Sequence, residues 1–162
     1  MDKTDIIQLI VAQLAHDLAI QLKAAITAHK ASTDSENIPD NKYETLALEA
    51  SYVAQGQANR AQEIKRALET YKQLTLQQFD DSSPIRLTAS VSLADDNNTT
   101  RNIFIGPLEG GMKVIDPLSK TVIVVVTPAS PLGKSLIGKM VGDMVRIGSG
   151  SAGKKLEIVA VS

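Results

Sequence analysis

The sequence predicts an α+β protein in which an N-terminal antiparallel coiled-coil hairpin precedes a domain with an antiparallel sheet and one short helix. The composition changes sharply near residue 80. Ala, Gln, Leu and Glu dominate before it, whereas every Gly except Gly56 and every Pro except Pro39 follows it, together with Val- and Ile-rich runs. Helix formers therefore precede strand formers and turn residues. We expect a helical hairpin over 1–80 and a second domain over 84–162.

Two heptad tracks predict the helices. Apolar and small residues recur at alternating spacings of four and three within 7–32 and within 47–75. This pattern is typical of a coiled-coil seam on each of two helices. Polar and turn-forming residues separate the tracks, so we expect the chain to fold back and form a tip at about 33–43. An open alternative is that the pair is half of a larger helical bundle.

The sizes of the side chains predict how the two helices pair. If facing residue numbers add to about 75, large residues meet at the base and alanines meet near the tip, where Ala25 faces Ala50. Gln21 then lies near Gln57 and forms a polar layer that could fix the register. We therefore expect a thin finger whose helices approach each other closely at the tip.

The second half is typical of a small antiparallel sheet. The predicted strands cover 85–93, 102–105, 121–127, 144–147 and 156–161. Ser130 as N-cap and Pro131 at the first helical position predict one short helix, which Gly138 would end. Residues 148–154 have the spacing of a phosphate-binding loop, but a strand-like run follows where a helix is required. We interpret 148–153 as a hairpin loop.

Composition excludes several classes of function. Lys and Arg total 17 against 18 Asp and Glu, so the net charge is −1 and a sequence-blind DNA binder is not expected. Only 3% of the residues are aromatic, which argues against base-stacking platforms and aromatic-lined pockets. The chain has no Cys, no segment typical of a targeting signal, and no run that approaches the length of a membrane span. We expect a cytoplasmic protein without a membrane partner.

The segment from Thr127 to Asp143 closely resembles the signature of the Gre (GreA/GreB) family of bacterial transcript-cleavage factors. The matching elements are Ser130-Pro131, Leu136-Ile137-Gly138-Lys139 and Gly142-Asp143, followed by a β-hairpin. A helical hairpin upstream is the other half of that family's architecture, and Glu63-Ile64-Lys65 is similar to its second-helix pattern. The resemblance implies that the second domain is FKBP-like. Prolyl isomerase activity is not expected, because that active site is an aromatic pocket and the second half has only Phe104.

The resemblance also implies a function. Gre factors bind RNA polymerase and insert the coiled coil into its secondary channel, where two acids at the tip help to hold a catalytic Mg²⁺ in the polymerase active site. The polymerase then cuts its own backtracked RNA, so this chain is expected to be neither an enzyme nor the holder of a cofactor of its own. RNA polymerase and the 3′ end of the nascent RNA are the implied partners. The residues implied to dock on the channel mouth are Ser130, Pro131, Leu132, Leu136, Ile137, Gly138 and Asp143.

The predicted tip is acidic. Residues 34–49 carry five acids against the single base Lys42. Carboxylates are the hard oxygen ligands that Mg²⁺ prefers. The resemblance implies that Asp40 and Glu44, the pair nearest to the family's pattern, are the candidate catalytic and metal-binding residues. Acids at a helix start also favour the helix dipole and solvate a loop, which is the structural explanation of the same cluster.

The spacing of these acids departs from the Gre pattern. That family has Asp and Glu three residues apart, whereas Asp40 and Glu44 are four apart. An ungapped alignment through 63–65 places Tyr43 and Leu46 at the family's positions. Three functions stay open: a factor that stimulates cleavage, a Gre-like channel-binding inhibitor or modulator without cleavage activity, and a polymerase-independent adaptor or chaperone-like protein.

Overall fold

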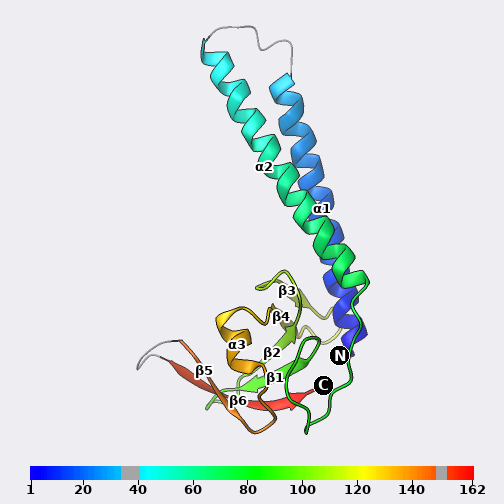
Figure 1. Ribbon diagram of the computed structural model, residues 1–162, viewed down its shortest axis with the longest axis vertical. Helices are drawn as coiled ribbons and strands as arrows, with labels where there is room; N and C mark the ends of the chain where they lie inside the picture. Colours follow the sequence, from blue (N-terminus) through cyan, green and yellow to red (C-terminus); the bar gives the residue numbers. More distant parts are fainter. Residues whose placement is uncertain (34–40, 149–152) are drawn as a thin grey trace. The chain divides into compact units, whose positions relative to one another are not determined.

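The computed structural model describes residues 1–33, 41–148 and 153–162 (Figure 1). The side chains of 32–33, 41–47 and 49–50 are outside this description. The chain divides into two compact units. One, the helix pair, is Val11–Lys72; the other, the sheet unit, combines Met1–Ile10 with Gln73–Ser162.

Two long helices make up most of the first half. Helix α1 spans Lys3–Thr33 and helix α2 spans Asn41–Lys72, which are 31 and 32 residues. At about 1.5 Å per residue, each is roughly 46–48 Å long. Within the helix pair they run antiparallel, and α2 (cyan at its start) extends beyond the end of α1 (Figure 1). The predicted pair of antiparallel helices is therefore confirmed, whereas most of the predicted tip at about 33–43 lies outside the described residues.

Helix α1 is unusually apolar. Over Lys3–Ala31 it is long and apolar enough, by length and composition alone, to cross a membrane, with a mean hydropathy of 1.4. The expectation that no stretch approaches a membrane span is therefore wrong for this helix. The finding is weak evidence for a membrane helix, because a core helix of a soluble protein passes the same test.

The sheet unit contains six strands and one short helix. In chain order these are β1 (Ser90–Ala94), β2 (Thr100–Ile105), β3 (Lys113–Ile115), β4 (Val122–Val126), α3 (Pro131–Leu136), β5 (Met144–Ile147) and β6 (Lys154–Val161). The strands lie in the order β3-β4-β2-β1-β6-β5. β2 and β4 pair in parallel and the other neighbours are antiparallel, so the predicted all-antiparallel sheet is wrong for one pair.

The parallel pair arises from a strand that the sequence patterns did not predict. After β2 the chain first forms β3 at the sheet's edge and then returns as β4 between β3 and β2. The return places Ile103 beside Val124 in parallel register. The first predicted strand is also shorter than expected, because Thr88 has a φ of 73° and β1 begins only at Ser90.

One face of the sheet carries the core. Strand residues from β1, β2, β4, β5 and β6 pack there with Leu136 of α3. The alternation of burial in β1 and β6 follows directly from the two-residue period of a strand. Helix α3 therefore covers part of this face, and its position determines which of its side chains remain exposed.

The start of α1 belongs to the sheet unit through polar contacts. The Lys3 ammonium donates a hydrogen bond to the backbone oxygen of Gln77 and lies 4.6 Å from the centroid of the Phe79 ring. Gln77 N in turn donates to Thr88 Oγ1 at 3.0 Å. Burial lowers the pKa of Lys3, and neighbouring Asp2 opposes that shift. These contacts fasten the segment after α2 to the sheet unit.

Candidate functional site

The Ser130–Asp143 segment begins with a capped helix. Ser130 Oγ accepts a hydrogen bond from Gly133 N at 3.0 Å and donates one to Thr127 O at 2.7 Å. Pro131 occupies the first helical position, where the missing N–H costs nothing. The predicted N-cap is therefore confirmed, and the two hydrogen bonds account for the Ser130 hydroxyl.

Gly133 allows α3 to approach the chain that leads into it. A Cβ on Gly133 would lie 1.9 Å from Thr127 O and 2.9 Å from Thr127 C. Both are backbone atoms, so the approach is possible only for glycine. The helix is consequently held against the end of β4, which fixes the direction of the loop that follows.

The loop after α3 is tied to the sheet unit at several points. Gly138 N donates to Ile85 O at 2.9 Å, and Ile85 N donates to Lys139 O at 2.8 Å. Gly138 has a φ of 82°, a backbone conformation that is strained for residues other than glycine. Asp143 closes the loop, because its Oδ2 accepts from Met140 N at 2.9 Å and its carbonyl oxygen accepts from Ile158 N at 2.9 Å.

The predicted docking residues divide into exposed and buried groups. Leu136 is 0% exposed and belongs to the core, and Leu132 is half-buried against it. Exposed residues of the segment are Pro131, Lys134, Ile137, Gly138, Lys139, Met140, Gly142 and Asp143. We name this set the α3 surface. Leu136 is therefore wrong as a docking residue, because its side chain faces the sheet.

The acidic tip is only partly described. Asp40 lies outside the described residues, and Glu44 lies in the first turn of α2, with its side chain outside the description. In the described part of the chain, no three His, Cys, Asp or Glu residues gather in a way that could hold a metal ion. The candidate metal ligands Asp40 and Glu44 therefore stay a prediction.

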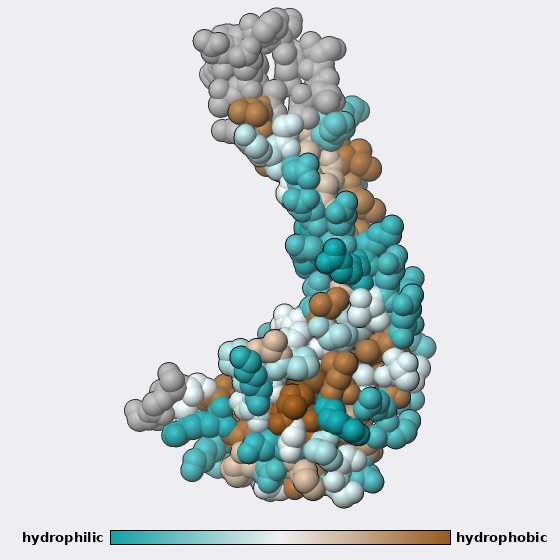
Figure 2. Space-filling model, in the orientation of Figure 1, coloured by the Kyte–Doolittle hydropathy of each residue, from teal (hydrophilic) through white to brown (hydrophobic). Residues whose placement is uncertain are grey.

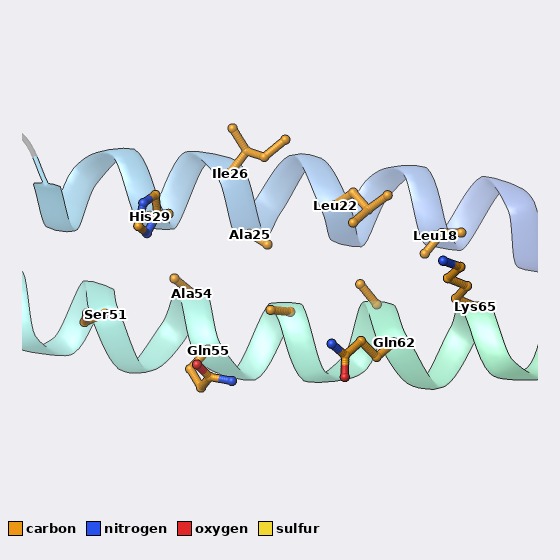
Figure 3. Close-up of a pocket in the computed structure, with 12 residues that line it drawn as sticks. Leu18, Leu22, Ala25, Ile26, His29, Ser51, Ala54, Gln55, Gln62 and Lys65 are labelled. Carbon is orange, nitrogen blue, oxygen red and sulfur yellow. The ribbon is translucent and has the colours of Figure 1, made fainter.

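A groove of about 710 Å³ runs along the helix pair (Figure 3). Alanines of both helices and two leucines of α1 line it, and Ile26 at its edge is 68% exposed. Figure 2 shows such hydrophobic side chains (brown) on the surface of the helix pair, among hydrophilic ones (teal).

The two helices pair in a different register from the predicted one. Leu18 lies opposite Lys65 and His29 lies opposite Ala54 across the groove (Figure 3). The predicted register would have set Leu18 opposite Gln57. Gln21 Oε1 is buried without a hydrogen-bond partner, so the predicted polar layer with Gln57 gains no hydrogen bond at this atom. Heptad spacing defines a seam but leaves its register open, because alanines recur along both tracks.

A second groove, of about 380 Å³, lies on the core face of the sheet. Its lining residues are Thr100, Arg101, Asn102, Ile103, Lys113, Val122, Val124, Val126, Leu132 and Ile147. The sequence patterns missed it because they did not predict β3. The turn signal Asp116-Pro117 between two short apolar runs could have indicated the β3–β4 hairpin.

Comparison with known proteins gives matches in structure only. No family model and no curated protein matches the chain. Gfh1 of Thermus aquaticus is similar at 18% identity and a TM-score of 0.40, covering 94% of this chain and 90% of that one. The GreA factor homolog Gfh1 of Thermus thermophilus is similar at 20% and 0.38, with 94% of each chain covered. The GreA/GreB transcription elongation factor of Nitrosomonas europaea is similar at 12% and 0.37, covering 61% and 78%.

Proposed function

We propose that this protein is a Gre-type transcription elongation factor that binds RNA polymerase and inserts its helix pair into the secondary channel. The observation that supports this most is the presence of two parts in one chain. A helical hairpin has an acid-rich turn, and a separate sheet unit carries the capped, fixed Ser130–Asp143 segment. The proposal implies a cytoplasmic protein that activates the polymerase and has no catalytic centre of its own.

The length of the two helices supports the proposed insertion into the secondary channel. Helices of 31 and 32 residues extend over roughly 46–48 Å. The acids lie in the sequence between the two helices and at the start of the second one. Within residues 34–49 the five acids and one lysine would add negative charge wherever the turn is inserted. A weakly held Mg²⁺ in the polymerase would be stabilised by such carboxylates and would supply the charge neutralisation that phosphodiester cleavage needs.

In this proposal the α3 surface binds RNA polymerase. Ile137 and Met140 are 38% and 39% exposed on a loop that backbone hydrogen bonds hold in place. Lys134 and Lys139 are exposed beside them. Rigid apolar side chains beside positive charge are typical of a specific interface, because little conformational entropy is lost on binding.

The tip assignment is tested with backtracked RNA polymerase complexes. Asp40→Ala and Glu44→Ala should each abolish shortening of the RNA, while the protein still binds the polymerase. Glu69→Ala removes an exposed carboxylate elsewhere on α2 and serves as the matched control, with cleavage unchanged. Unchanged cleavage in both tip variants would show that these acids are not the catalytic pair.

The attachment is tested separately by measuring binding to the polymerase. Ile137→Ser should weaken binding with only a small loss of unfolding temperature, because Ile137 is 38% exposed. Val159→Ser, at an apolar position that is 42% exposed on β6, is the control and should leave binding unchanged. Equal binding by both variants would remove the α3 surface from the proposal.

A second candidate function rests on the spacing of the acids. Asp40 and Glu44 are four residues apart instead of three, which favours a channel-binding modulator without cleavage activity. Such a protein would give no RNA shortening at any concentration and would still change pausing or initiation. A polymerase-independent adaptor would neither bind the polymerase nor change any of these reactions.

A further inference from the structure

The core face of the sheet is only partly covered. Helix α3 has six residues, and its buried Leu136 packs on this face. Beside it the 380 Å³ groove exposes the continuation of the same face, with Ile103, Val124 and Leu132 among its lining. An apolar sheet face is normally buried against another layer, and within the described residues this part of the face lacks the layer that α3 supplies elsewhere.

The apolar surface continues onto the β3–β4 hairpin. Ile115 pairs directly with Val122, which lines the groove, and the two side chains are 55% and 43% exposed. Opposed residues of an antiparallel pair project to the same side of the sheet. Beyond them the turn presents Leu118, which is 92% exposed.

The hairpin turn is held in one conformation. Asp116 Oδ1 accepts from Leu118 N at 3.0 Å, and Asp116 Oδ2 accepts from Ser119 Oγ at 2.5 Å. These hydrogen bonds lower the pKa of Asp116. The exposed Leu118 is therefore presented by a preorganised turn, as interface anchors commonly are.

The charge that lines the groove has one sign. Arg101 and Lys113 line it, and none of the ten described lining residues is acidic. Lys120 shares the hairpin turn with Asp116, whose carboxylate oxygens already accept from Leu118 N and Ser119 Oγ. We name the groove together with Ile115, Leu118 and Lys120 the hairpin groove. An apolar floor with a cationic rim is complementary to a ligand that combines apolar side chains with carboxylates.

We propose that the hairpin groove docks an amphipathic helix of a partner protein, with apolar side chains toward the sheet and acidic residues toward Arg101, Lys113 and Lys120. A helix fits this position because it would supply the missing cover of the sheet face next to α3. The inference does not depend on the proposed function, since the groove lining shares only Leu132 with the residues implied to dock on the polymerase and none with the tip.

The test uses the whole protein and three fluorescent synthetic peptides. One is an 18-residue helix with leucines at positions i, i+3, i+4 and i+7 and glutamates on both flanks. The second has the same composition in scrambled order, and the third has lysine in place of glutamate. Fluorescence anisotropy should show binding of the first peptide and at least about tenfold weaker binding of the other two, a difference of about 1.4 kcal/mol.

Variants locate the binding. Leu118→Ser and Val122→Ser should weaken binding of the leucine–glutamate helix by about tenfold each, and Arg101→Glu should weaken it further at low salt. Val159→Ser is the matched control, because Val159 and Val122 are strand valines with exposures of 42% and 43%. Unfolding temperatures of the variants should match that of the parent, which separates lost binding from lost folding.

Several results would overturn the proposal. Equal binding of the ordered and scrambled peptides would show non-specific adsorption, and equal loss in Val122→Ser and Val159→Ser would place binding elsewhere. Failure of the leucine–glutamate helix to bind would exclude this ligand chemistry. Concentration-dependent dimerisation that Leu118→Ser abolishes would identify a second copy as the occupant.

Discussion

The helix pair and the sheet unit use their apolar residues differently. In the sheet unit, Val91, Leu93 and Ile158 are each 0% exposed and share one core. In the helix pair, Ile20, Ile26 and Tyr52 are 51%, 68% and 70% exposed. A sheet face covered by a helix forms a closed interior, whereas two helices bury only one stripe each.

This contrast separates two sources of stability. The sheet unit depends on tightly packed side chains, so changes in volume there should be costly. The helix pair depends more on intrinsic helix propensity and on a narrow seam. Substitutions of its side chains should therefore leave the free energy of unfolding unchanged or even raise it. The following predictions test that difference, in descending order of expected effect.

Removing one core side chain should have the largest effect. Leu136→Ala should lower the free energy of unfolding by about 2–5 kcal/mol, because Leu136 is 0% exposed. Its neighbour Ile137 is 38% exposed, and Ile137→Ala should cost only about 0.5 kcal/mol. Chemical denaturation measures both. Similar losses would contradict the division of α3 into a buried and an exposed side.

The same substitution should have opposite signs in the two units. Gly133→Ala should destabilise the sheet unit by about 1–3 kcal/mol, because the new Cβ would lie 1.9 Å from Thr127 O. Gly56→Ala should stabilise the helix pair by about 0.5–1 kcal/mol, since a Cβ there meets nothing within 4 Å. Calorimetry would detect both, and a shared sign would contradict the comparison.

An apolar replacement in the helix seam should be tolerated. Gln21→Leu should leave the free energy of unfolding unchanged or raise it by about 1 kcal/mol, because it removes a buried Oε1 that has no hydrogen-bond partner. Gln57→Leu is the companion variant. If Gln21 and Gln57 instead formed the polar layer expected from the sequence, both substitutions would destabilise the protein in thermal unfolding.

The smallest expected effect is on acid stability. Hydrogen bonds from Ser82 and Ser83 lower the pKa of Asp80, and Ser119 Oγ and Leu118 N lower that of Asp116, both from 3.8. A lowered folded-state pKa stabilises the protein above the unfolded value, and this contribution is lost as pH falls through the folded value. Ser119→Ala and Ser82→Ala should therefore flatten the loss of melting temperature below about pH 4. If the melting temperature fell with pH in the same way in these variants and in the parent, the serine hydrogen bonds would not be the cause of the lowered pKa values.

Local patterns predicted most of the elements. The heptad tracks predicted α1 and α2, and Ser130-Pro131 predicted the start of α3. Alternation predicted a strand at β1, and the last two strands were expected on either side of the Gly- and Ser-rich loop. These signals are contained in neighbouring residues, which explains why one sequence was enough to find them.

Sequence by itself determined the helix pair, the short helix, most of the strands and the acidic composition of residues 34–49. Only the tertiary structure decided the helix register, the parallel β2–β4 pair and the burial of Leu136. It also revealed the hairpin groove, because residues of β2, β3, β4, β5 and α3 that are distant in sequence line it together. The physical reason is that register and burial depend on which distant segments meet, and a repeated alanine or a half-apolar helix fits several partners equally well.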